Sequence, residues 1–88
     1  ENPSPVFLVR GVHISGLRLI GSEKNHVRFQ AVQNKARIDA VGFNLAREFS
    51  SVDPGQDGLD LVCELQVNDW NGRNKLELKI LDLQVAGQ

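Results

Sequence analysis

The sequence lacks the patterns that membrane proteins require. Its 88 residues contain no apolar run of about eighteen residues, the length at which a helix can span a bilayer. A basic segment followed by an apolar one is also missing from the amino terminus. We therefore expect no membrane span, no signal peptide and no membrane partner.

Cysteine is almost absent, because Cys63 is the only one in the chain. A single cysteine cannot form a disulfide bond within the chain, and Cys63 stands in an apolar alternation that predicts burial. A buried thiol that is not oxidised is typical of a reducing compartment, which favours a cytoplasmic location.

Side chains that could hold a metal or act as a nucleophile are not clustered in the sequence. His13 and His26 fall on different predicted strands, and neither has an acidic neighbour at a ligand-like spacing. Ser15 and Ser22 lack the flanking glycines of a nucleophile elbow, and no glycine-rich loop leads into a helix. We expect no catalytic residue, no metal site and no cofactor here, so this chain is not an enzyme by itself.

A basic excess, which is common in nucleic-acid binders, is missing too. Ten lysines and arginines stand against eleven aspartates and glutamates, giving a net charge of −1. Phosphates respond to the local arrangement of charge, so acidic residues gathered on one side could leave a basic face on the other. Five acidic residues do fall near the predicted helix, its loop and the next strand: Glu48, Asp53, Asp57, Asp60 and Glu64.

What the sequence does contain is a series of strand signals. Residues 1–5 hold two prolines and predict an extended connector from a preceding domain, so the folded domain covers 6–88. Val, Leu and Ile dominate residues 6–20, where Gly11 and Gly16 predict bulges or bends in a long first strand.

A hairpin is predicted next. Apolar and polar residues alternate over 27–32 and again over 37–42, with a short turn between these segments. Because side chains of paired strands alternate between two faces, Arg28 and Arg37 should share the outward face of this hairpin.

A short helix and a second hairpin follow. Asn44 is a candidate N-cap for a helix over 45–49, which needs tertiary packing to be stable. After a turn-rich loop, the alternation resumes over 59–68 and 76–85, with a phase change that predicts a bulge near Leu81.

The predicted order is therefore three strands, one short helix and two strands. This is the order of the OB-fold, a five-stranded, partly open Greek-key barrel. An SH3-like barrel is the main alternative, but it does not ordinarily place a helix between its third and fourth strands. We predict an all-β, five-stranded OB-fold barrel with one short helix between strands 3 and 4.

The turn between the last two strands carries the most informative candidates for binding. It holds the only tryptophan, Trp70, which could stack on a base. In an OB-fold this turn borders the groove over the second and third strands, where single strands bind. The residues that we predict to line such a nucleic-acid groove are Arg18, Lys24, Arg28, Arg37, Trp70, Asn71, Arg73 and Lys75. Asp39 would lie among these cations.

Each candidate also has a plain structural interpretation. Trp70 could pack on the end of the barrel, and Asn71-Gly72 could be present only because a tight turn needs positive φ angles. Basic residues such as Arg28, Arg37 and Lys79 are what any solvated strand face would show. These interpretations stay open at the level of sequence.

Six segments resemble the carboxy-terminal OB domain of the RecJ family, which are exonucleases specific for single-stranded DNA. The most specific is Asn68-Asp69-Trp70-Asn71-Gly72-Arg73, followed by Asn2-Pro3-Ser4-Pro5-Val6-Phe7. The others are residues 26–29, 38–43, 59–65 and 76–82. The resemblance covers essentially the whole chain.

The resemblance implies a module of a larger, metal-dependent 5′–3′ exonuclease. The catalytic lobes would bind manganese or magnesium outside this chain, and the barrel would guide single-stranded DNA toward them. Trp70, Asn71 and Arg73 are carried over from the family's hairpin motif as DNA-binding residues. The alternative is a non-catalytic scaffold or protein-interaction domain with weak or no nucleic-acid binding. In either role we expect a monomer whose partners include the catalytic lobes.

Overall fold

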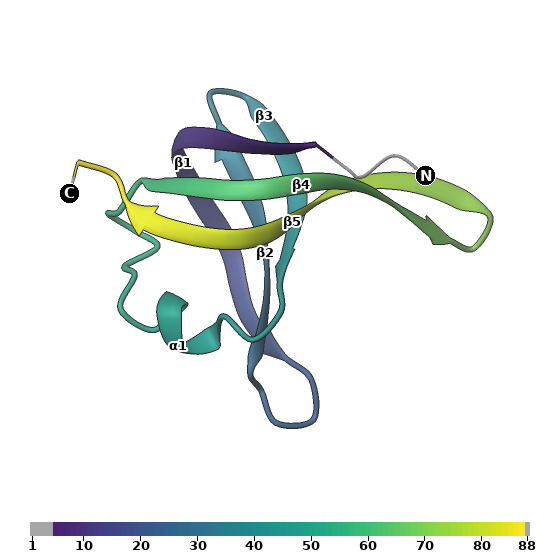
Figure 1. The fold of residues 1–88 in the computed structure, drawn as a ribbon, viewed down its shortest axis with the longest axis horizontal. Helices are drawn as coiled ribbons and strands as arrows, with labels where there is room; N and C mark the ends of the chain where they lie inside the picture. The colour runs from purple at the N-terminus through teal and green to yellow at the C-terminus, as the bar shows by residue number, and fades with distance from the viewer. Residues whose placement is uncertain (1–4, 88) are drawn as a thin grey trace.

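The computed structural model describes residues 5–87, so most of the connector predicted over 1–5 lies outside the described residues. Within them the chain forms five strands and one helix: β1 (Val6–Ile20), β2 (His26–Gln33), β3 (Ala36–Gly42), α1 (Ala46–Phe49), β4 (Leu59–Trp70) and β5 (Arg73–Val85) (Figure 1). The strands close into a barrel in the order β1-β2-β3-β5-β4. The predicted all-β barrel, with its helix between the third and fourth strands, is confirmed. No helix among residues 5–87 is long and apolar enough to cross a membrane.

Strand β1 is long enough to serve two neighbours, and it bends to do so. Its first half pairs with β4 and its second half with β2, both antiparallel. Each ladder contains a register shift, and the shifted segments hold Gly11 and Gly16, with φ angles of 68° and 67°. Because a left-handed backbone conformation is strained for other residues, glycine permits these irregularities. The bends predicted at the two glycines are confirmed.

The inward side of the barrel is apolar on every strand. The core includes Val12, Ile14, Val27, Phe29, Ala31, Ala40, Leu59, Leu61, Cys63, Leu78 and Ile80. Helix α1 lies below one end of the barrel and contributes Phe49, whose ring centroid lies 5.1 Å from that of Phe29 (Figure 1). Burial of Phe49 explains how a helix of four residues is stable, since tertiary packing replaces the missing helical turns.

The predicted N-cap of the helix is wrong. Helix α1 begins at Ala46, and Leu45 occupies the cap position without a side-chain hydrogen bond. Asn44 has a φ of 60°, whereas an N-cap residue normally has an extended conformation. Its side-chain oxygen instead accepts a hydrogen bond from Asn25, and its N–H donates to Nδ1 of His26 at 2.9 Å.

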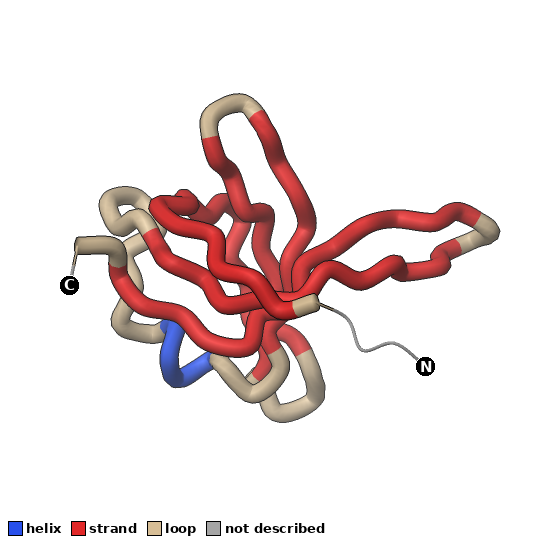
Figure 2. The backbone as a smooth tube through the Cα atoms, turned by 45° about the horizontal axis from the view of Figure 1, so that its top comes forward, coloured by secondary structure: helices blue, strands red, loops and turns tan. Residues whose placement is uncertain are grey.

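The β4–β5 hairpin extends beyond the closed part of the barrel as a projecting arm, as does the tip of the β2–β3 hairpin (Figure 2). Val62 pairs with Asp82 and Cys63 with Ile80, which leaves Leu81 as the extra residue. The bulge predicted near Leu81 is therefore confirmed. Cys63 is buried as predicted, and its removal from water raises the pKa of its thiol.

The bend at Gly16 can be tested by substitution. Gly16→Ala should lower the free energy of unfolding by about 1–2 kcal/mol, because alanine is strained at this φ angle. No atom lies within 4 Å of the position that a Cβ would take, so backbone strain and not a clash would cause the loss. Urea unfolding measures the change.

Gly55→Ala is the matched control for this substitution. Gly55 lies outside the positive-φ region, and its nearest neighbour would be Oδ1 of Asp53 at an ordinary 3.5 Å. Alanine there should leave stability unchanged or raise it by about 0.4–1 kcal/mol. Equal losses at both glycines would contradict the assignment of strain to the bend.

Candidate nucleic-acid interface

Polar side chains on the outward sides of neighbouring strands form one face across the barrel. Cα partners run in a row from β1 to β4, through Ser15, Gln30, Asp39, Glu77 and Gln66. Because side chains alternate along a strand, the outward positions next to this row are two residues away. We define the polar face by the outward residues Arg18, Arg28, Gln30, Arg37, Asp39, Gln66, Arg73, Lys75 and Glu77.

Glu77 is the buried centre of this face. Glu77 is only 4% exposed, and both of its carboxylate oxygens have partners. Oε2 lies 3.3 Å from Nη1 of Arg28, and Oε1 accepts a hydrogen bond of 2.7 Å from Nε2 of Gln66. A buried carboxylate needs such partners, because removing an unpaired charge from water costs several kcal/mol, on the order of 5. Glu77 thus holds Arg28 in position.

Asp39 forms a second, more exposed cluster beside Glu77. Its Oδ2 lies 2.5 Å from Nζ of Lys75, whose side chain is 68% exposed. Its Oδ1 accepts a hydrogen bond from Nε2 of Gln30, and Oε1 of the same Gln30 side chain accepts one of 2.9 Å from Nη1 of Arg37. The Lys75 hydrogen bond is the main reason that the pKa of Asp39 lies below its usual value, and Gln30 adds to this effect against the cost of burial.

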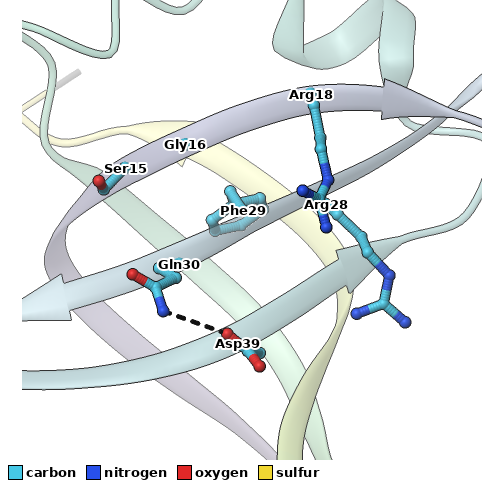
Figure 3. A pocket seen from close by; sticks show the side chains of 7 residues that line it. All are labelled: Ser15, Gly16, Arg18, Arg28, Phe29, Gln30 and Asp39. Carbon is cyan, nitrogen blue, oxygen red and sulfur yellow. Dashed lines mark hydrogen bonds between the residues drawn. The ribbon is translucent and has the colours of Figure 1, made fainter.

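A shallow hollow of about 260 Å³ opens at the edge of the polar face. Figure 3 shows Arg18 and Arg28 at one end and the hydrogen-bonded pair Gln30 and Asp39 at the other. Arg18 and Arg28 are Cα partners on β1 and β2. The hollow lies at the bend around Gly16, which offers no side chain to fill it. Two guanidinium groups beside an open hollow can hold phosphate oxygens.

Asn71 and Gly72 form the tight turn at the tip of the projecting arm, as their structural interpretation predicted. Both residues have positive φ angles, 51° and 76°, as a two-residue hairpin turn of type I′ requires. Arg73 is exposed, and the alternation of β5 places it on the same side as Lys75. Its Cα partner is Trp70, of which the structure describes the backbone and not the side chain. Stacking by Trp70 therefore stays a prediction.

The structure brings five predicted cations together and leaves two predicted residues at turns. The outward sides of β1, β2, β3 and β5 carry Arg18, Arg28, Arg37, Arg73 and Lys75. The shared face expected for Arg28 and Arg37 is confirmed by their paired strands. Lys24 is exposed in the turn between β1 and β2, and Asn71 lies at the tip of the arm.

Sequence reasoning missed the partners of these cations. Gln30, Gln66 and Glu77 were not among the candidates, and Asp39 was expected near the cations without a named partner. In the sequence these four residues show only that they occupy outward positions of their strands. That pattern does not reveal that β3 lies beside β5. Among residues 5–87, no three His, Cys, Asp or Glu side chains are close enough to hold a metal ion.

The order of strands in the barrel, with a helix between β3 and β4, defines an OB-fold. Solved structures share it. The second single-stranded DNA binding protein, SSBb, of Mycobacterium smegmatis matches with a TM-score of 0.72 and 20% identity, covering 91% of this chain and 84% of that one. The mitochondrial single-stranded DNA binding protein Rim1 of S. cerevisiae matches with a TM-score of 0.70 and 10% identity, covering 94% and 96%. At these identities the likeness concerns the fold alone.

The chain belongs to the RecJ OB domain family, whose sequence profile matches residues 1–82. It is 34% identical over 85 residues to the single-stranded-DNA-specific exonuclease RecJ of Bacillus subtilis, which is 97% of this chain. RecJ of Thermus thermophilus, solved with Mn²⁺, matches with a TM-score of 0.65 and 24% identity over 94% of this chain. The chain spans 11% of the length of each of these two relatives.

The Asp39–Lys75 pair should make stability depend on pH under acid conditions. A carboxylate whose pKa is lowered by folding stabilises the folded state above its unfolded pKa, near 3.8 here, and loses this contribution as the pH falls through the folded pKa. Asp39→Asn removes the titrating group. Between about pH 5 and pH 2, this variant should therefore lose about 0.2–1 kcal/mol less unfolding free energy than the unmodified chain.

Urea unfolding at a series of pH values measures this difference. Lys75→Ala removes the hydrogen bond that mainly lowers the pKa of Asp39, so it should reduce the acid dependence in the same way. A variant Asp39→Asn that loses as much stability in acid as the unmodified chain would show that this pair does not contribute.

Proposed function

We propose that this domain binds single-stranded DNA along its polar face and guides it toward the catalytic lobes of a RecJ-type 5′–3′ exonuclease. The observation that carries the proposal is the set of cations on the outward sides of β1, β2, β3 and β5: Arg18, Arg28, Arg37, Arg73 and Lys75. In OB-folds the second and third strands form the centre of the oligonucleotide-binding surface. A member of the RecJ OB domain family that carries cations there is suited to a phosphate chain.

The chemistry of the face favours contacts to the phosphate backbone over base recognition. Guanidinium and ammonium groups pair with phosphate oxygens, and the hollow beside Arg18 and Arg28 is open to such a group. Gln30 and Gln66 already bond to carboxylates of the face, so their amides are engaged. Binding of this kind tolerates many sequences and weakens as salt rises. Stacking on Trp70 would add to it.

The catalytic step belongs to other parts of the parent protein in this proposal. One relative is named a single-stranded-DNA-specific exonuclease, and the other was solved with Mn²⁺ and with Mg²⁺. The chain corresponds to 11% of each, and its described residues offer no cluster of metal ligands. We therefore assign binding of single-stranded DNA to this barrel and metal-dependent cleavage to the rest of the parent protein.

A scaffold function is the second candidate, because one observation favours it. The inward sides of β4 and β5 continue into the projecting arm, where nothing described covers Leu65, Val67 and Leu76, which are 39%, 60% and 52% exposed. Leu65 also lines an apolar hollow of about 350 Å³, together with Phe7 and Ile38. Apolar surface of this kind suits packing against protein more than against phosphates.

Fluorescence anisotropy of a labelled single-stranded oligonucleotide tests the first proposal. At low salt the domain should bind the single strand more tightly than a duplex of the same sequence. Its affinity should fall with salt, with a slope in log–log form of about −0.7 for each phosphate contact. Arg18→Ala and Arg73→Ala should each reduce the magnitude of that slope by about 0.7.

These two arginines are suited to the test because both are exposed and neither has a salt bridge to another described residue. Their loss leaves no buried carboxylate unpaired, unlike the loss of Arg28. Arg47→Ala, on helix α1, is the matched control and should not change binding. Failure to bind at low salt would favour the scaffold function, and equal effects of all three variants would overturn the assignment of the face.

A further inference from the structure

Two carboxylates stand in the middle of the cations that are proposed to hold DNA. Asp39 and Glu77 are Cα partners on β3 and β5, and each forms a salt bridge with one cation of the polar face. A phosphate chain that reaches Lys75 or Arg28 therefore meets a cation that already has a negative partner. How each pair responds depends on its exposure.

The Arg28–Glu77 salt bridge should remain intact when single-stranded DNA binds. The Glu77 side chain is only 6% exposed, and Gln66 occupies its second oxygen. Separating Arg28 would leave a buried charge without its cation, which is strongly unfavourable. A guanidinium has five N–H donors, and Arg28 donates only one of them, from Nη1, to Glu77. Arg28 can thus bind a phosphate and keep this partner.

The Lys75–Asp39 salt bridge, in contrast, can open so that Lys75 pairs with a DNA phosphate. The Lys75 side chain is 68% exposed and that of Asp39 is 24% exposed, so water and a phosphate can reach both groups. An ammonium on a flexible stem can turn from one oxygen to another. When Lys75 leaves, Asp39 keeps the Gln30 hydrogen bond and the favourable charge of nearby Arg28. The exchange therefore leaves no buried group without a partner.

We propose that Asp39 is an internal competitor for phosphate, which takes Lys75 back whenever a DNA phosphate leaves and so keeps the DNA contact at Lys75 weak and short-lived. This inference rests on the proposed function and adds to it a residue that sets the affinity for DNA. A strand phosphate that pairs with Lys75 leaves Asp39 to attract a cation from solution. Fewer cations are then released overall, so Asp39 lowers both the affinity and its dependence on salt.

The test compares the unmodified chain with Asp39→Asn in the anisotropy titration and in stopped-flow dissociation of the same oligonucleotide. Asp39→Asn should bind single-stranded DNA about twofold to fivefold more tightly at low salt, the range that an exposed ion pair supports. The magnitude of its salt slope should rise by about 0.7, corresponding to one more phosphate contact. The gain should appear mainly as slower dissociation.

Glu48→Gln is the matched control, because it makes the same change in net charge on helix α1, away from the polar face. It should leave affinity and slope unchanged. In the Lys75→Ala background, Asp39→Asn should lose most of its effect, since the competed cation is gone. Far-UV circular dichroism confirms that each variant is folded before titration.

The outcomes separate the two proposals. If the unmodified chain binds and Asp39→Asn binds no more tightly, the competitor role is wrong and strand binding stands. The same holds if Glu48→Gln raises affinity equally, because net charge would then explain the gain. If neither the unmodified chain nor Asp39→Asn binds single-stranded DNA at low salt, both proposals fail.

Discussion

The parallel pairing of β3 with β5 is the constraint on which both the core and the polar face depend. It consists of three Cα pairs, Asp39 with Glu77, Ala40 with Leu78 and Val41 with Lys79. The middle pair points inward, and both of its residues are buried in the core. The first pair brings two carboxylates together on the outside. One short ladder therefore closes the barrel and sets the charges of its surface.

Two neighbouring carboxylates repel each other, so this pairing has to be compensated. Arg28 from β2 and Gln66 from β4 approach Glu77, and Lys75 and Gln30 approach Asp39. Three of these four groups come from the flanking strands β2 and β4, and Lys75 comes from β5 itself, which means that the face is assembled only in the closed barrel. This arrangement also explains how a chain of net charge −1 can present cations in one place. Two acidic residues, Asp39 and Glu77, stand among the cations, and the sequence predicted this for Asp39 and not for Glu77.

Much of the fold could be predicted from local patterns. Period-two alternation located the strands to within a few residues, because one side of each strand faces a single core. The bends at Gly11 and Gly16 and the bulge at Leu81 also left local signals. Asn44 misled the prediction because asparagine suits a left-handed turn as well as an N-cap, and only the turn contacts near Asn25 decide between them.

The candidate site could be predicted only in part, for a physical reason. Arg28 and Arg37 were placed correctly because they lie on one antiparallel hairpin, whose register follows from its turn. The bond between Lys75 and Asp39 depends instead on a parallel register between strands that α1 and β4 separate in the chain. No local period encodes that register. Partners across β3 and β5 therefore had to come from the structure.

The β4–β5 arm joins the two candidate functions in one element. Its outward side carries Arg73 and Lys75, whereas its other side continues the core with Val67 and Leu76, which are Cα partners. Because side chains of a two-stranded sheet point to opposite faces, a strand of DNA on one side leaves the other side available for protein. Strand binding and packing against the rest of a larger exonuclease thus do not compete for the same surface. An arm that is held on its apolar side would present its cations in a fixed orientation, which would reduce the entropy lost when DNA binds.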